Sequence, residues 1–175
     1  MRLRTRLILA LNLVLGVAMV FLFMWLRSRT LATTLGEFSE AGVQVNLSLE
    51  KNGAASCILA ARYAPLMEHF HLYSKDLPPF GVQGQGRPTR LDIISGLVAT
   101  GELTADATPT DFTTMGSDVV LYVYPDGPVT LRLPVSVAGD GSAQVKVSYM
   151  ACSAVSCLPA KAKTLDINLS QCEAR

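Results

Sequence analysis

The sequence predicts a small all-β sandwich behind a hydrophobic N-terminal segment, and three observations support this fold class. Seven or eight short segments have strand character, and the clearest of them alternate apolar and polar residues, which is the period of a strand with one buried face. Gly, Pro and Asp residues typical of turns separate these segments, and no helical period follows the N-terminal run. The chain has 175 residues, the length of one ordinary domain with a targeting or linker sequence. We therefore expect one hydrophobic core between sheets.

The N-terminal run, residues 7–26, contains no charged residue. A helix of that length spans about 30 Å, the thickness of a bilayer core. Arg2, Arg4 and Arg6 precede the run and only Arg27 and Arg29 follow it, which places the N-terminus in the cytoplasm by the positive-inside rule. We expect residues 1–26 to be a single-pass anchor in the cytoplasmic membrane, with a cleaved signal peptide as the alternative. The remainder is expected in the periplasm or another extracytoplasmic space.

Residues 27–42 show little periodicity and are expected to be a stalk, which leaves residues 43–175 for the domain. Strict alternation predicts strands at 43–50 and 129–137, and Pro134 in the second favours a position at the sheet edge. Residues 81–88 are predicted to be a loop, and 95–116 to contain little regular structure beyond a short strand near 96–100. The other predicted strands are 57–63, 69–74, 91–94, 119–124, 145–149 and 165–169.

Charge and composition exclude several classes of function. The chain has 15 basic and 14 acidic residues and a net charge of +1, so neither nucleic acid nor an acidic partner is indicated. Aromatic residues are too sparse for a platform that stacks single-stranded bases. No Ser/His/Asp arrangement, phosphate-binding loop or carboxylate pair stands out. We expect neither small-molecule catalysis nor a cofactor.

Four cysteines, Cys57, Cys152, Cys157 and Cys172, are candidates for disulfides if the domain is exported. Cys152 and Cys157 are close in sequence between two predicted strands, where a disulfide is geometrically feasible. Closing so short a ring stabilises by roughly 2 kcal/mol, against nearly 5 kcal/mol for the long loop from Cys57 to Cys172. This comparison favours a bridge that opens and closes, although a structural staple of a hairpin loop fits the spacing equally well. Cys57 and Cys172 are expected either to form a structural disulfide or to remain buried thiols.

A metal site is a weaker interpretation of the same residues. His69 and His71 project to one face of a strand, but no second close cysteine pair completes a zinc site. A copper site of the cupredoxin type would want a histidine shortly after Cys152, and none follows. We therefore predict no metal.

Three segments carry a resemblance to a known family. Residues 147–152, followed by Cys157-Leu158-Pro159 and by 163–165, look like the active-site segment of the N-terminal periplasmic domain of DsbD-type thiol:disulfide interchange proteins, the disulfide bond corrector family. Residues 71–75 resemble the strand near that family's cysteines, and 129–137 resemble its Leu-x-Leu-Pro-Val strand. Together the segments cover most of residues 43–170.

The resemblance implies an immunoglobulin-like β-sandwich and a redox-active dithiol. The chain would be a protein-disulfide reductase or redox-relay module, with a membrane electron-transfer protein as donor and exported thioredoxin-fold or cysteine proteins as acceptors. Cys157 would form the mixed disulfide with a partner, and Cys152 would resolve it. This sequence lacks the multi-span and thioredoxin-like domains of full-length interchange proteins, so another polypeptide would supply the electrons.

The resemblance also suggests supporting residues. Tyr73 matches a position that packs over the pair, and Phe112 is the candidate for an aromatic residue that shields it. His71 stands where the family commonly has an aromatic residue, and is expected to act in proton transfer or to be a half-exposed strand residue. Lys161 and Lys163 would lower a thiolate pKa if they folded close to the pair, or would be solvated surface charges.

Two other functions stay open on the sequence. The first is a non-catalytic immunoglobulin-like binding or assembly domain whose disulfides are structural. The second is a thiol metal carrier. The lability of the Cys152–Cys157 bridge separates the redox function from the first alternative, and stoichiometric metal binding would indicate the second.

Overall fold

The structure is a computed structural model that describes residues 32–51, 57–113, 118–139 and 141–169. These residues form antiparallel β-strands and no helix, which confirms the predicted all-β class. The predicted membrane helix at 7–26 lies outside them. Within the described part of the chain, no helix is long and apolar enough to cross a membrane. The strands are β1 (Ala32–Glu40), β2 (Val43–Lys51), β3 (Cys57–Pro65), β4 (His71–Leu72), β5 (Arg90–Ser95), β6 (Leu97–Ala99), β7 (Thr104–Ala105), β8 (Thr110–Thr113), β9 (Val120–Val123), β10 (Val129–Val137), β11 (Ser142–Tyr149), β12 (Ala151–Cys152) and β13 (Lys161–Asn168).

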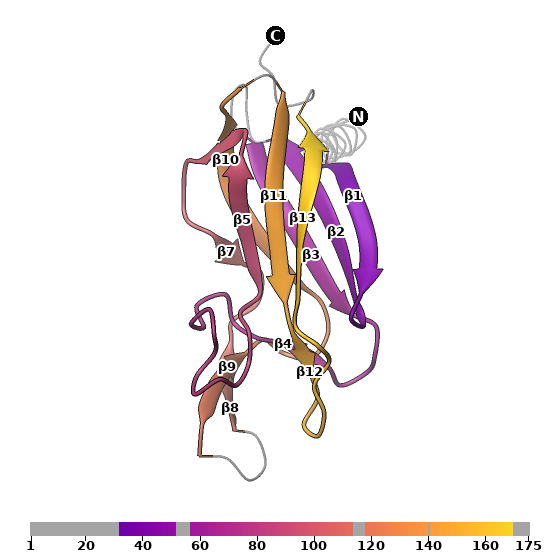
Figure 1. Ribbon diagram of the computed structural model, residues 1–175, viewed down its shortest axis with the longest axis vertical. Helices are drawn as coiled ribbons and strands as arrows, with labels where there is room; N and C mark the ends of the chain where they lie inside the picture. The colour runs from indigo at the N-terminus through magenta and orange to yellow at the C-terminus, as the bar shows by residue number, and fades with distance from the viewer. Residues whose placement is uncertain (1–31, 52–56, 114–117, 140, 170–175) are drawn as a thin grey trace, which may run out of the picture. The chain divides into compact units, whose positions relative to one another are not determined.

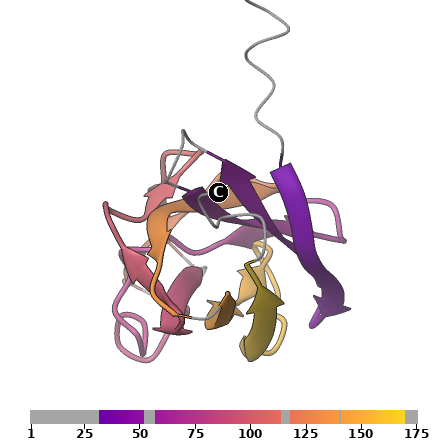
Figure 2. The ribbon, with the colours of Figure 1, turned by 90° about the horizontal axis from the view of Figure 1, so that it is seen from above.

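Two sheets enclose one core, as in a β-sandwich. The larger sheet has the order β1-β2-β3-β10-β6, with β7 also paired to β10, and the smaller has the order β13-β11-β5. Alternate residues of β2, β10 and β11 are buried, as their period predicts, and they meet in one cluster between the sheets. Figure 2 looks down on the two layers, with the indigo and purple N-terminal strands in one and the yellow C-terminal strand in the other. This arrangement agrees with the immunoglobulin-like class implied by the resemblance.

The expected stalk at 27–42 is wrong for residues 32–40, which form β1 and pair with β2. Leu35 and Phe38 pack against the core from this strand. A register shift between Thr34 and Gly36 interrupts the pairing, and this β-bulge changes which residues face inward. The bulge explains why no simple alternation marks the strand in the sequence. The domain therefore begins at or before Ala32.

The expected edge position of β10 is also wrong, because β10 has β3 on one side and β6 and β7 on the other. Pro134 lies between the residues that pair with β6 and those that pair with β7. Its carbonyl accepts a hydrogen bond from the Thr100 amide, at 2.9 Å, on that interrupted side. Proline has no amide hydrogen to donate, and at Pro134 this donor is missing where the ladder is already interrupted. A proline is therefore tolerated in this interior strand.

Two small ladders at one end of the sandwich position the site. β12 pairs with β4, and β8 pairs with β9 (Figure 1). The strand expected at 69–74 is reduced to His71–Leu72, because His69 takes a positive φ of 60° and Tyr73 makes only an isolated bridge to Val123. A second cluster of buried side chains joins these ladders.

Candidate functional site

Cys152 and Cys157 form a disulfide with an S–S distance of 2.07 Å. Cys152 ends β12 and is only 1% exposed, whereas Cys157 lies after the turn and is exposed. One cysteine is therefore held inside the domain and the other is an exposed residue.

The turn between the cysteines is held by its own polar groups. The Ser153 amide donates to the Ser156 carbonyl at 2.7 Å, and the Ser156 amide donates to the Ser153 hydroxyl at 3.2 Å. The Leu158 amide then donates to the Ala151 carbonyl at 2.9 Å and closes the loop. Val155, at the tip, is 87% exposed. The loop thus presents Cys157 beside an apolar side chain on an ordered turn.

Tyr73 is the closest polar partner of the disulfide. Its hydroxyl donates to Cys152 Sγ at 3.0 Å and lies 3.9 Å from Cys157 Sγ. Burial raises the pKa of Tyr73, so the hydroxyl keeps its proton as a donor at neutral pH. A donor aimed at a sulfur stabilises the thiolate that forms when the bridge opens.

His71 lies opposite Cys152 in the β4–β12 ladder and is buried. Its Nδ1 is 3.7 Å from Asp126 Oδ1, and its buried Nε2 has no hydrogen-bond partner in the described part of the chain. Burial lowers the pKa of His71, while Asp126 opposes that shift. The ring centroid lies 4.6 Å from that of Phe112 and 5.8 Å from that of Tyr73. His71 is thus buried inside the site. The expectation of a half-exposed strand residue is wrong.

Phe112 comes from β8 and is half-buried against the cluster that contains Cys152 and Tyr73. A hollow of about 320 Å³ opens beside it, and its lining includes His71, Asp126 and Ala154 from the turn between the cysteines. Tyr73, His71 and Phe112, which the sequence comparison placed around the pair, are therefore gathered in one neighbourhood.

Two other expected contributors lie elsewhere. Lys161 and Lys163 both form ion pairs with Glu40, the second at 2.7 Å. The hydrogen bond from Lys161 and then that from Lys163 lower the pKa of Glu40. The two lysines are accordingly engaged with β1, as partly exposed surface charges.

Cys57, on β3, is buried and belongs to a disulfide. Its predicted partner, Cys172, lies outside the described residues. No group of three or more His, Cys, Asp or Glu side chains among residues 32–51, 57–113, 118–139 and 141–169 is placed to hold a metal ion.

Sequence reasoning missed Asp126 and Gly86. Asp126 lies between the predicted strands 119–124 and 129–137, and nothing local to it indicates an interaction with His71. Gly86 has a φ of +73°, and a Cβ there would come within 2.9 Å of the Tyr73 ring. The cluster of glycines in residues 81–88 indicates that the backbone there approaches another part of the protein closely. It does not indicate that this part is Tyr73.

No protein-family model matches the chain, and no curated protein matches it. Among solved structures it is similar to the N-terminal periplasmic domain of ScsB from Proteus mirabilis, with a TM-score of 0.55 and 13% identity. The match covers 81% of this chain and 52% of that one, so the chain matches about half the length of that structure. The fold is that of the matched half of the ScsB N-terminal periplasmic domain. The resemblance to DsbD-type N-terminal domains is thereby confirmed at the level of the fold.

Two further structures are similar at lower scores. The DsbD N-terminal domain of Neisseria meningitidis, in the reduced form, has a TM-score of 0.41 and 12% identity over 63% of this chain and 75% of that one. The GAE domain of GGA2p from Saccharomyces cerevisiae has a TM-score of 0.39 and 8% identity over 80% of this chain and 97% of that one.

Proposed function

We propose that this chain is an extracytoplasmic thiol–disulfide exchange domain that passes reducing equivalents through Cys152 and Cys157. The observation that carries the proposal is the asymmetry of the pair. Cys157 is open to a macromolecular partner, while Cys152 is buried against the Tyr73 hydroxyl. A staple of a hairpin loop needs neither the exposed sulfur nor the hydroxyl aimed at the buried one.

The asymmetry supports one order of steps. In the reduced domain, the Cys157 thiolate attacks a disulfide sulfur of the partner, and the other partner sulfur leaves as a thiolate that takes a proton. The Cys152 thiol then loses its proton and attacks Cys157 Sγ. The partner leaves with two thiols, having gained two electrons and two protons, and the Cys152–Cys157 disulfide forms again. A dithiol donor restores the domain by the reverse sequence.

The site residues take distinct roles in this mechanism. Tyr73 stabilises the thiolate of Cys152 as a hydrogen-bond donor, and His71 is a buried base whose Nε2 is available for a proton. Phe112 limits access of water and small thiols from the side of β8. We further propose that residues 1–26 anchor the domain in the cytoplasmic membrane, that the donor is a membrane electron-transfer protein, and that exported thioredoxin-fold proteins are the acceptors.

Lability tests this function against that of a binding domain with structural disulfides. The full chain is equilibrated with graded dithiothreitol, the thiols are blocked with an alkylating agent, and mass spectrometry follows each cysteine. We expect Cys152 and Cys157 to be half reduced at a dithiothreitol concentration at least about tenfold lower than that for Cys57. Opening of both bridges at one concentration would contradict the redox function.

A further inference from the structure

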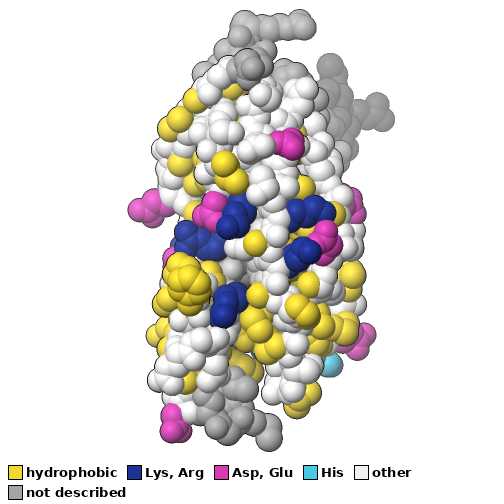
Figure 3. All heavy atoms as spheres, in the orientation of Figure 1, with side chains coloured by type: hydrophobic (Ala, Val, Ile, Leu, Met, Phe, Trp, Pro, Cys, Tyr) yellow, Lys and Arg dark blue, Asp and Glu magenta, His cyan; other side chains and the backbone are white. Residues whose placement is uncertain are grey.

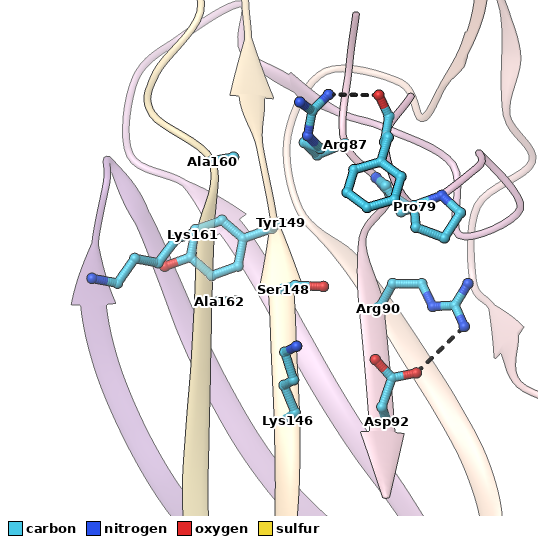
Figure 4. Close-up of a pocket in the computed structure, with 12 residues that line it drawn as sticks. Pro79, Arg87, Arg90, Asp92, Lys146, Ser148, Tyr149, Ala160, Lys161 and Ala162 are labelled. Carbon is cyan, nitrogen blue, oxygen red and sulfur yellow. Dashed lines mark hydrogen bonds and ion pairs between the residues drawn. The ribbon is translucent and has the colours of Figure 1, made fainter. Parts of the chain in front are cut away.

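A groove of about 440 Å³ lies on the outer face of the smaller sheet, and neither cysteine of the disulfide lines it. The residues at its floor have small side chains: Ser148 of β11 pairs with Ala162 of β13, and Ala160 adjoins them. Arg90, on the other side of Ser148, supplies a long side chain at the groove edge, as does Lys146 along β11. Figure 4 shows Ser148 and Lys146 on β11, between Ala162 on β13 and Arg90 and Asp92 on β5, with Ala160 just before β13.

The groove is cationic on a domain that is not. Its lining has four basic side chains and a single acidic one, Asp92, whereas the described residues as a whole carry nine basic and twelve acidic residues. The basic residues are Arg87, Arg90, Lys146 and Lys161. Glu40 offsets Lys161 from outside the groove. Figure 3 shows the Lys and Arg side chains gathered across the middle of the face that β5, β11 and β13 form. Such a local concentration of one sign attracts a partner of the opposite sign.

One rim of the groove is an ordered apolar projection. Phe80 is 80% exposed. Leaving so large an apolar side chain in water is unfavourable, and such exposure is typical of a residue that contacts a partner. The loop that presents it is held by Arg87, whose Nη1 donates to the carbonyls of Phe80 and Gly84, each at 2.9 Å, and to that of Gly86. The aromatic side chain is therefore presented on a loop that is already ordered, which reduces the entropy lost on binding.

The groove is continuous with the cysteine loop along the chain. Ala160 follows Cys157 by three residues, a reach of at most about 10 Å in extended backbone. Tyr149 precedes Cys152 by the same interval and also lines the groove. When a partner's cysteine reacts at Cys157, residues of the partner a few positions away from that cysteine can therefore reach the groove.

We propose that this groove binds an acidic segment, with an apolar side chain against Phe80, of the protein whose disulfide reacts at Cys157. The inference rests on the proposed function and names the chemistry of the partner. Carboxylates of the segment lie over Lys146 and beside Arg90, whose Nη2 also pairs with Asp92 at 3.4 Å. The small residues Ser148 and Ala162 leave room for its backbone. The groove contributes to encounter and orientation, and takes no part in the exchange of sulfur bonds.

The test uses the reduced full chain in a neutral detergent and three cysteine peptides activated as 2-pyridyl disulfides. Each peptide contains Leu and Cys and two variable residues beside them. The variable residues are both Glu in the acidic peptide, both Gln in the neutral peptide and both Lys in the basic peptide. Release of the pyridyl thiol reports the rate of exchange. We expect the acidic peptide to react about tenfold faster than the neutral one at low salt, and this preference to disappear near 1 M salt.

Two charge reversals of equal size locate the effect. Lys146→Glu changes the groove, while Arg62→Glu changes an exposed residue of β3 in the other sheet. Lys146→Glu is expected to reduce the rate with the acidic peptide by about fivefold or more, and Arg62→Glu by less than about twofold. Arg62→Glu should also leave the rate with the neutral peptide unchanged.

The contradicting results are distinct from one another. Equal rates for the three peptides, or equal losses in the two variants, would overturn this inference and leave the proposed function intact. Failure of all three peptides to react would remove the proposed function and the inference with it. Binding of anionic phospholipid vesicles that Lys146→Glu abolishes, without a preference for the acidic peptide, would overturn the inference and assign the groove to a membrane surface.

Discussion

At the scale of single residues, the two cysteines differ in burial, and the proposed function rests on this difference. Cys152 is enclosed by the cluster that includes Tyr73, Leu121 and Val123, while Cys157 is exposed after the turn. A partner sulfur approaches only the exposed atom without displacing packed side chains. The buried atom is then reserved for the intramolecular step, where no partner has to reach it.

Tyr73→Phe tests the hydrogen bond to the buried sulfur. Removing the hydroxyl takes away a donor that stabilises the Cys152 thiolate, so the pKa of the Cys152 thiol, followed in the Cys157→Ala background, should rise by about one unit. The ultraviolet absorbance of the thiolate, followed against pH, measures this. Tyr122→Phe is the control, because Tyr122 is exposed on the neighbouring β9. An unchanged thiol pKa in Tyr73→Phe would show that the hydroxyl has no role in thiolate stability.

His71 should make the domain less stable in mild acid. Its folded-state pKa lies below the ordinary value, so the unfolded chain binds the proton more readily. The stabilisation is fully present above the unfolded pKa of about 6.5 and is lost as pH falls toward the lower folded pKa. Urea unfolding between about pH 7 and pH 5 should show a smaller loss for His71→Asn than for the wild type. His69→Asn, which removes a ring 87% exposed beside the same Asp126, should follow the wild type; a flattened profile in that variant instead would contradict the role of His71.

At the scale of elements, regular alternation was enough to predict β2 and β10. Strands that a bulge interrupts or a turn shortens were not predictable. β10 occupies the predicted residues 129–137, because its inward side chains are all apolar. β4 is two residues long because the chain turns at His69 and leaves the ladder at Tyr73. β1 escaped prediction because its bulge breaks the period of two. Local pattern reports one face of a strand, whereas bulges and two-residue ladders are set by neighbours distant in sequence.

The candidate site was predictable in its members but not in its geometry. The resemblance pointed to Cys152, Cys157, Tyr73 and Phe112, and three of these share a cluster in the structure. The exposure of one cysteine and the burial of the other depend on β12 pairing with β4, about eighty residues earlier. Nothing in the spacing of the two cysteines indicates which is buried.

Gly96→Ala tests the turn by which the chain passes from β5 in one sheet to β6 in the other. Gly96 has a φ of +77°, and a Cβ there would lie 2.0 Å from the Ser142 carbonyl oxygen, which is backbone and cannot give way cheaply. We expect the free energy of unfolding, from urea titration, to fall by at least about 3 kcal/mol. Gly127→Ala isolates the backbone contribution, because Gly127 has a φ of +106° and open space around it, and should cost about 1 kcal/mol. Equal losses in the two variants would show that the contact with β11 is unimportant.

At the scale of the whole domain, buried tyrosines connect the two sheets beneath the site and the groove. The Tyr63 hydroxyl of β3 donates to the Arg90 carbonyl of β5 at 2.6 Å, and the Tyr149 hydroxyl of β11 donates to the Glu40 carbonyl of β1 at 3.0 Å. Their rings meet edge to face, with centroids 5.7 Å apart. Burial raises the pKa of Tyr149 to about 12, so both its proton and its hydrogen bond persist throughout the neutral range. These contacts join the two sheets of the sandwich, which carries the Cys152–Cys157 disulfide at one end.

The central claim is that Cys157 meets the partner and Cys152 resolves, and the reaction of single-cysteine variants tests it most directly. Full-length Cys152→Ala and Cys157→Ala are each mixed with glutathione disulfide, and mass spectrometry follows the rate of mixed-disulfide formation. The account predicts that Cys152→Ala, which keeps the exposed thiol, reacts at least about tenfold faster than Cys157→Ala. Equal rates, or faster reaction of Cys157→Ala, would contradict it.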